Sequence, residues 1–314
     1  MEQDNLLKLI EEYIDGLTRR PKTKQDYKKI LMDYFHYVSN ITDSPTRQTI
    51  VDYKESLEKR MSPASVQKYI ICLRGFYEDL QATGKGINIV LKIQCSTIQP
   101  VFKRQPLTLK QARALISRAK RLATRPKHTI EDIRNYALVV LLLGTGLRTI
   151  EVERADVEDI SKNDEMIRLY IQGKGHAEKD DFVKLSDHIY EALTNYLMER
   201  SDDYEPLFIH HGRNVTDENR RISTYTIRTV VKDLLRQIGI DDERYSAHSL
   251  RHTAATFATN ILHKDTTDIQ YFLRHKDPKT TERYMHSLQR ENSTIENELG
   301  DLLFNDSKNQ KGKL

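Results

Sequence analysis

The scarcity of chain-breaking residues constrains the fold of this chain most strongly. Its 314 residues include only 12 glycines and 8 prolines, and both residue types interrupt regular structure and mark turns. A many-turned β sandwich needs such turn residues roughly every 8–12 positions. The length is enough for about two domains. We therefore expect a mainly helical protein of two domains.

Residues 1–93 contain four stretches in which apolar residues recur every three or four positions, the pattern of helices that bury one face. Ser44 and Ser62 each precede a proline. A hydroxyl at the N-cap followed by proline is a typical helix start, so we expect the third and fourth helices to begin at these serines. The fourth should end at Gly84. These patterns predict a compact helical N-terminal domain.

The rest of the chain predicts a linker and a second domain. Residues 94–106 follow neither a helical nor an alternating pattern, which indicates a linker. Helical spacing resumes in 107–304, where alternating apolar residues near 167–171 and a short partner strand predict a β-hairpin. The polar tail 305–314 is expected to be disordered. The expected fold class is α+β, mainly helical with a small β-hairpin or sheet.

The longest apolar run, Ala137–Leu143, is far shorter than the roughly 20 residues that a membrane-spanning helix needs. It belongs to a segment expected to form a buried central helix that ends at Gly144. Two cysteines are too few for a disulfide framework or a thiolate metal cage, and the polar N-terminus does not resemble a signal peptide. We therefore expect no membrane association and a cytoplasmic location.

Positive charge is concentrated in one segment. The net charge is only +4, from 50 Lys and Arg against 46 Asp and Glu. Between Ser96 and Ile130, however, there is no acidic residue and there are nine basic ones. Such a concentration suits binding to the phosphate backbone of DNA, although a solvated helix face beside an acidic neighbour would give the same pattern. The candidate DNA contacts are Lys103, Arg104, Arg113, Arg118 and Arg121.

Three short motifs carry residues suited to phosphoryl chemistry. In GTGLRTIE, Arg148 follows two glycines, and its guanidinium matches the geometry of phosphate oxygens. In HSLRHT, His248 and Arg251 lie one helical turn apart on the same face. In LRHKDPKTTERYMH, His275 precedes Tyr284 by nine residues. Each motif alone also has an ordinary reading, as an ion-paired arginine, a chance pair or a packed tyrosine.

The order and spacing of these motifs together resemble the catalytic set of the tyrosine recombinase (phage integrase) family, and the resemblance covers nearly the whole chain. It implies a core-binding domain followed by a catalytic domain. It adds Glu151 as the acidic residue that supports Arg148, and Lys174 as the lysine of the hairpin. Lys174 is preferred over Lys179 and Lys184 because it lies between two glycines, where the backbone can approach DNA closely.

The resemblance implies that the Tyr284 hydroxyl attacks a DNA phosphodiester, giving a 3′-phosphotyrosyl bond and a free 5′-hydroxyl. Arginines and a histidine donor would stabilise the negative charge that develops on the phosphate. His248 could share the proton of the tyrosine, and Lys174 would protonate the leaving oxygen. No metal or other cofactor is required, because the arginines take the role that Mg²⁺ has in two-metal nucleases.

One position departs from the family pattern. Arg274 precedes His275 where the family usually has glycine, and we expect it either to add a phosphate contact or to shift this turn.

The resemblance also implies double-stranded DNA with a specific recombination site as partner, and a homotetramer on two duplexes joined through the apolar segment Thr294–Phe304. The chain resembles the simple two-domain members. We expect a recombinase that integrates or excises a mobile element or phage, with Xer-type resolution of chromosome or plasmid dimers as the alternative. The apolar C-terminal segment disfavours a type IB topoisomerase, and the complete set of motifs disfavours an inactive DNA-binding protein.

Overall fold

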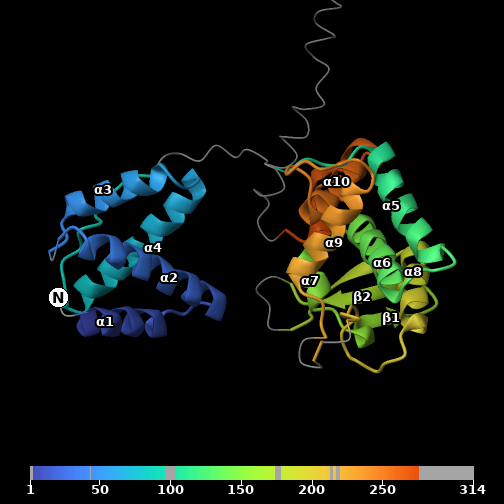
Figure 1. Ribbon diagram of the computed structural model, residues 1–314, viewed down its shortest axis with the longest axis horizontal. Helices are drawn as coiled ribbons and strands as arrows, with labels where there is room; N and C mark the ends of the chain where they lie inside the picture. Colours follow the sequence, from blue (N-terminus) through green and yellow to red (C-terminus); the bar gives the residue numbers. More distant parts are fainter. Residues whose placement is uncertain are drawn as a thin grey trace, which may run out of the picture. The chain divides into compact units, whose positions relative to one another are not determined.

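The computed structural model describes residues 3–42, 44–95, 104–173, 178–212, 215–216 and 220–275. The chain divides into two compact units, residues 1–100 and 101–314 (Figure 1). The described part is mainly helical with one small antiparallel sheet, which confirms the expected fold class. None of its helices is long and apolar enough to cross a membrane.

The first unit is built from four helices, α1 (Gln3–Gly16), α2 (Pro21–Ser39), α3 (Arg47–Glu58) and α4 (Pro63–Ala82). Their apolar faces meet in one core. Tyr34 is fully buried there, and its ring meets Phe35, Tyr53 and Tyr77 edge-on. Its hydroxyl lies 3.1 Å from that of Tyr77, so the buried polar atoms have partners, as a core requires.

The starts of two helices in this unit test the sequence-based expectations. The prediction for α4 is confirmed, because the Ser62 hydroxyl accepts the Ser65 backbone N–H at 3.3 Å. The expected start of α3 at Ser44 is wrong. The helix begins at Arg47 because Thr46 is the capping residue, and its N–H donates to the Thr49 hydroxyl at 3.0 Å.

The second unit contains helices around a three-stranded sheet. Its helices are α5 (Leu109–Thr124), α6 (Ile130–Thr145), α7 (Thr149–Glu153), the 3₁₀ helix η1 (Val157–Asp159), α8 (Asp187–Glu199), α9 (Thr224–Arg236), α10 (Ala247–Asn260) and α11 (Thr266–Leu273). The strands β1 (Ile160–Lys162), β2 (Ile167–Ile171) and β3 (Asp181–Leu185) are antiparallel in the order β1-β2-β3. Leu169 of β2 lies opposite Val183 of β3, which confirms the predicted hairpin. Strand β1 was not predicted because three residues are too few to show an alternating pattern.

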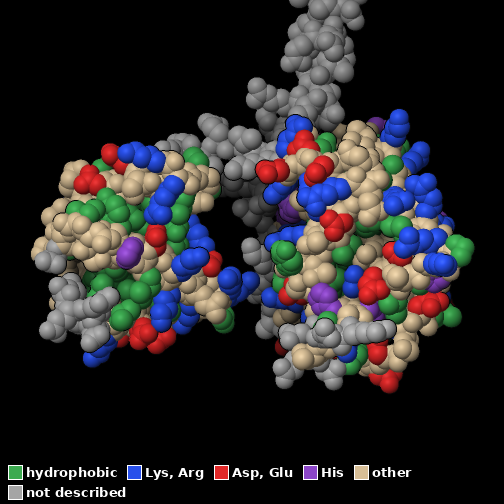
Figure 2. All heavy atoms as spheres, viewed as in Figure 1, with side chains coloured by type: hydrophobic (Ala, Val, Ile, Leu, Met, Phe, Trp, Pro, Cys, Tyr) green, Lys and Arg blue, Asp and Glu red, His purple; other side chains and the backbone are tan. Residues whose placement is uncertain are grey.

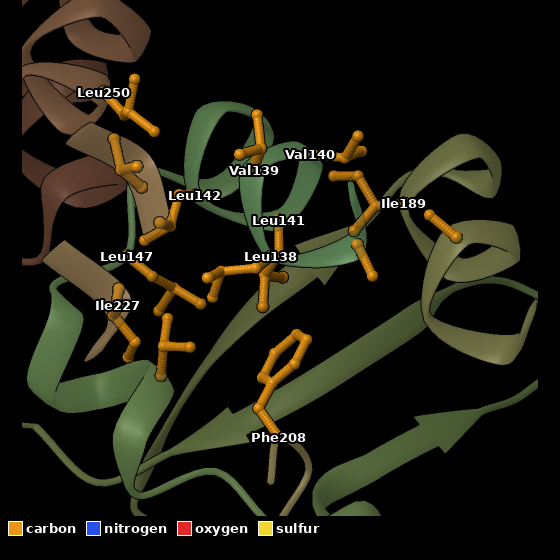
Figure 3. Close-up of a cluster of buried hydrophobic side chains, with 14 of the residues drawn as sticks. Leu138, Val139, Val140, Leu141, Leu142, Leu147, Ile189, Phe208, Ile227 and Leu250 are labelled. Atoms are coloured by element: carbon orange, nitrogen blue, oxygen red, sulfur yellow. The ribbon is translucent and has the colours of Figure 1, made fainter. Parts of the chain in front are cut away.

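Helix α6 is the centre of the second unit, as expected from its apolar sequence. It packs against α5, α8, α9 and α10. Leu138 and Leu141 are fully buried, and Figure 3 shows α6 side chains clustered with Phe208, Ile227 and Leu250. Burial of each such side chain contributes roughly 1.5–3 kcal/mol. A rigid α6 therefore fixes the start of the segment that follows it.

The end of α6 differs from the prediction by one residue. The helix ends at Thr145 rather than at Gly144, and Gly146 takes the left-handed conformation with φ of +61°. The Gly146 N–H donates to the Leu142 carbonyl at 3.1 Å, which ends the helix. A Cβ atom at Gly146 would lie 3.0 Å from the Phe272 ring. This glycine thus allows both the turn and the close approach of α11.

We predict that Gly146→Ala destabilises the second unit more than Gly239→Ala does. Both glycines have positive φ, but only Gly146 has a neighbour in the way of a Cβ atom. The left-handed backbone should cost each variant about 1–2 kcal/mol, and overpacking against Phe272 should add about 1–3 kcal/mol. Denaturant unfolding of both variants measures the difference. Equal losses of unfolding free energy would show that the Phe272 ring moves aside without cost.

Candidate active site

Arg148 and Glu151 form a charged capping pair at the start of α7. The Arg148 backbone N–H donates to Glu151 Oε2 at 2.7 Å, and its guanidinium Nη1 donates to Glu151 Oε1 at 2.7 Å. The Glu151 side chain is 1% exposed, whereas that of Arg148 is 27% exposed. The carboxylate is therefore buried, and it holds a guanidinium that still reaches the surface at the junction between α6 and α7.

Glu151 has a second cationic partner in Arg274. The Arg274 Nη2 atom donates to Glu151 Oε2 at 3.1 Å, and the Arg274 side chain is 10% exposed. Burial alone would raise the pKa of Glu151. The charge of Arg274, the N–H and charge of Arg148, and more distantly Arg251 outweigh that effect, so the pKa is lowered and the carboxylate is ionised at neutral pH.

Arg251 ties together the ends of two helices. It is 5% exposed on α10, and its guanidinium donates to the backbone carbonyls of Gly146 and Leu273. These carbonyls lie at the C-terminal ends of α6 and α11, where a cation is electrostatically favoured. His248 lies one turn before Arg251 and is exposed. Its ring meets that of His252 edge-on, with 4.7 Å between centroids.

The histidines of this region are surrounded by positive charge. Loss of water contact, followed by the charges of Arg251 and Arg148, lowers the pKa of His275 to about 4. Desolvation of the ring, followed by the charges of Arg251 and Arg148, also lowers the pKa of His248. Desolvation, followed by its neighbour His248, lowers the pKa of His252 to about 3. The imidazoles are therefore neutral at pH 7 and able to donate one hydrogen bond and accept another.

His275 is held in place through its backbone. Its N–H donates to the Gln270 carbonyl at 3.1 Å, and the Gln270 side-chain amide donates back to the His275 carbonyl at 3.2 Å. The residue directly follows Arg274, which has a left-handed backbone. The end of α11 therefore fixes the backbone position of His275.

The structure thus brings Arg148, Glu151, Arg251, His248 and His275 to one region where α7, α10 and the end of α11 meet. Lys174 and Tyr284, along with Lys103 and the segment 294–304, lie outside the described residues. Lys179 lies within them and is engaged elsewhere: its Nζ atom is 2.5 Å from Asp156 Oδ2 and 2.6 Å from Asp159 Oδ2.

The basic segment includes helix α5, and Figure 2 shows Lys and Arg side chains gathered on the surface there. Arg113 and Arg121 are exposed. Arg118 is half-buried, and its Nε atom donates to the Gln237 side chain at 2.8 Å. Arg104 donates to the Glu243 backbone carbonyl. Of the four candidates that the structure describes, Arg113 and Arg121 are therefore exposed on the surface. Arg104 and Arg118 are held by hydrogen bonds to residues of the second unit.

Sequence reasoning missed two features of this region. Arg228 of α9 is one of the cations that lower the pKa of His248, together with Arg104, and no motif marked it. The inward direction of the Arg274 side chain was also not predicted. Its place where the resembling family has glycine was a visible signal, but spacing alone does not show which way a side chain turns.

Two family models match this chain. Residues 105–291 match the model of the phage integrase family, and residues 10–84 match that of the phage integrase N-terminal SAM-like domain. The second unit therefore contains a tyrosine recombinase catalytic domain. The chain belongs to the phage integrase family, which confirms the resemblance seen in the sequence.

Among curated relatives, tyrosine recombinase XerD of Listeria innocua serovar 6a is 28% identical over 84% of this chain and 87% of the relative. Tyrosine recombinase XerC of Caldanaerobacter subterraneus subsp. tengcongensis is 26% identical over 82% of this chain, and the match spans 64% of the relative. The fold is shared with XerH recombinase bound to difH substrate, with a TM-score of 0.71, 18% identity and coverage of 94% and 95% of the two chains. It is also shared with a lambda integrase tetramer bound to a Holliday junction, with a TM-score of 0.67, 16% identity and coverage of 90% and 76%.

The lowered histidine pKa values predict that folding stability falls as the pH falls. His252 has a pKa of about 3 when folded against 6.5 as the ordinary value, so the unfolded chain binds more protons between these values. Its contribution is complete above pH 6.5 and is lost progressively toward pH 3. We expect the free energy of unfolding, measured with denaturant between pH 7 and 4.5, to depend less steeply on pH in His252→Gln. The decrease in slope should correspond to at most one fewer proton taken up on unfolding. An unchanged slope would contradict the prediction.

Proposed function

We propose that this chain is a site-specific DNA recombinase that cleaves and rejoins DNA through a 3′-phosphotyrosyl intermediate on Tyr284. The observation that carries the proposal is the junction of α7, α10 and α11. There Arg148 and Arg251 are held by buried partners, beside two histidines that are neutral at pH 7. Such a cluster of fixed donors suits a phosphate on which negative charge develops.

The proposed step conserves the phosphodiester energy. The Tyr284 oxygen bonds to phosphorus while the bond from phosphorus to the 5′-oxygen breaks, and attack by a 5′-hydroxyl of another strand reverses the reaction. Arg148 and Arg251 would stabilise the non-bridging oxygens, each by about 10²–10³ in rate. We assign His248 to share the tyrosine proton and His275 to donate a hydrogen bond to the phosphate. The energy stays in the covalent bond, so the reaction needs no nucleotide cofactor.

We assign the role of general acid to Lys174, which would protonate the leaving 5′-oxygen. The contacts of Lys179, one of the two competing hairpin lysines, support this assignment. Lys179 is held between Asp156 and Asp159, and these two hydrogen bonds outweigh desolvation and raise its pKa. A lysine with a raised pKa in a double ion pair is a poor proton donor.

The proposed partner is double-stranded DNA that carries a specific recombination site. The exposed Arg113 and Arg121 on α5, with Arg118, Arg104 and Lys103, would contact its phosphates. Phosphate contacts fix the position of a protein on DNA without reading the sequence. We propose integration or excision of a mobile element as the biological role. Xer-type dimer resolution is the second candidate, supported by curated relatives named XerC and XerD.

We further propose assembly as a homotetramer on two duplexes, in which the segment Thr294–Phe304 of one copy docks on the next. An apolar groove of about 410 Å³ lies between α6, α10 and α11, and Leu143, Phe257 and Phe272 are among its lining residues. Leu262 on its rim is 64% exposed. A groove of this character is suited to the apolar side chains of that segment.

The nucleophile is tested with a nicked suicide duplex that carries the DNA sequence that the protein protects from nuclease digestion. The wild-type protein should form a covalent adduct that survives denaturing electrophoresis. Tyr284→Phe should bind the duplex with similar affinity but form no adduct, because it lacks the attacking oxygen. An adduct in this variant would assign the nucleophile to another residue.

Assembly is tested by deletion of residues 291–314. We expect this variant to bind a half-site and to form the adduct, but to lose recombination between two duplexes and the four-copy complex in native electrophoresis. Deletion of 305–314 alone retains the apolar segment and serves as the control, with recombination unchanged. Full recombination after the longer deletion would exclude docking through this segment.

A further inference from the structure

We infer that Arg274 is a positioning residue that orients Arg148 through the buried carboxylate of Glu151. The inference rests on the proposed function, since its consequence is measured as DNA cleavage. It concerns a residue that this chain has where the family usually has glycine.

The backbone at Arg274 favours glycine. Arg274 caps α11 with φ of +52° and ψ of +48°, in the left-handed region that glycine adopts freely and that residues with a Cβ atom adopt at a cost. Its N–H donates to the Tyr271 carbonyl at 3.0 Å. Glycine would therefore fit this backbone, and arginine adds a side chain here at a conformational cost.

The side chain turns into the protein. Its Nη1 atom donates to the Phe272 carbonyl at 2.8 Å, and its Nη2 atom donates to Glu151 Oε2 at 3.1 Å. With 10% of the side chain exposed, the guanidinium spans from the end of α11 to the start of α7. Both of its terminal nitrogens therefore bind protein atoms, and the side chain connects the last turn of α11 with the carboxylate at the start of α7.

The two oxygens of Glu151 have different sets of partners. Oε1 accepts from the Arg148 guanidinium, while Oε2 accepts from the Arg148 backbone N–H and from Arg274. A carboxylate fixed at Oε2 presents Oε1 in one direction, and this direction sets that of the Arg148 guanidinium. Supporting residues of this kind matter because a displacement of about 1 Å at a reacting centre can cost 10²-fold in rate.

Arg274 also shares the last turn of α11 with Arg251. Arg274 binds the Phe272 carbonyl, and Arg251 binds the adjacent Leu273 carbonyl. The two cations thus occupy neighbouring acceptors at one helix end. Loss of Arg274 would leave Glu151 with Arg148 as its hydrogen-bonding cation and would loosen the contact between α7 and α11.

The experiment compares Arg274→Gly and Arg274→Lys with the wild-type protein on the suicide duplex. Glycine suits the backbone, so this variant should fold and should bind DNA within twofold of wild type. Its rate of adduct formation should fall at least tenfold, and lysine should restore part of the rate because it returns a cation. His263→Gly is the control: His263 is exposed and also left-handed, with φ of +52°, and its replacement should leave the rate unchanged.

A pH profile separates positioning from a general loss of structure. The charged and titratable groups around Glu151 are Arg148, Arg251, Arg274 and His275. Removal of Arg274 takes away an attractive charge and raises the pKa of Glu151, so the acid limb of the cleavage rate should move to higher pH in Arg274→Gly. His263→Gly should keep the wild-type limb.

A double-mutant cycle tests whether Arg274 acts through Glu151. In the background of Glu151→Gln, Arg274→Gly should lower the rate by less than threefold, because the carboxylate through which Arg274 orients Arg148 is already absent. Rate losses that multiply, or an Arg274→Gly variant as fast as wild type, would overturn the inference. Wild-type adduct formation and its absence in Tyr284→Phe report on the proposed function separately, so the failure of either one is recognised by itself.

Discussion

The rest of the site depends on the ion pairs that the buried carboxylate of Glu151 makes with Arg148 and Arg274. The carboxylate lies at the start of α7, it is almost inaccessible to water, and two arginines from separate parts of the chain converge on it. An isolated buried charge would be strongly unfavourable. The two arginines offset the cost of burying the carboxylate, and in turn it determines where their guanidinium groups lie.

Apolar packing around α6 fixes the helices that carry these charged residues. Helix α6 is buried among α5, α8, α9 and α10, and it delivers Gly146 to the place where α11 approaches. Arg251 then fastens the ends of both helices by their carbonyl oxygens. The polar contacts of the site thus connect helices that also pack through apolar side chains. A shift of the end of α6 or α11 would move Arg251, which binds both.

Much of this arrangement could be predicted from the sequence. The few glycines and prolines predicted the helical fold, and the motifs around Arg148, His248 and Arg251 identified the family. The sequence did not show that Thr46 caps α3 or that Gly146 ends α6, because both depend on hydrogen bonds and contacts that several nearby residues could have made. It also did not show that Arg118 binds Gln237, a residue 119 positions away. Which of two adjacent candidates is used, and where a long side chain turns, depends on the packed structure.

The lowered pKa values of the histidines have a consequence for the protein without DNA. Burial is the largest cause of these shifts and the charges of Arg251 and Arg148 add to it, so both histidines lie in a desolvated region close to positive charge. In the proposed function, a phosphate diester bound in this region would supply negative charge opposite these arginines. DNA would then act as a counterion for the folded protein, and its binding would raise the conformational stability of the site.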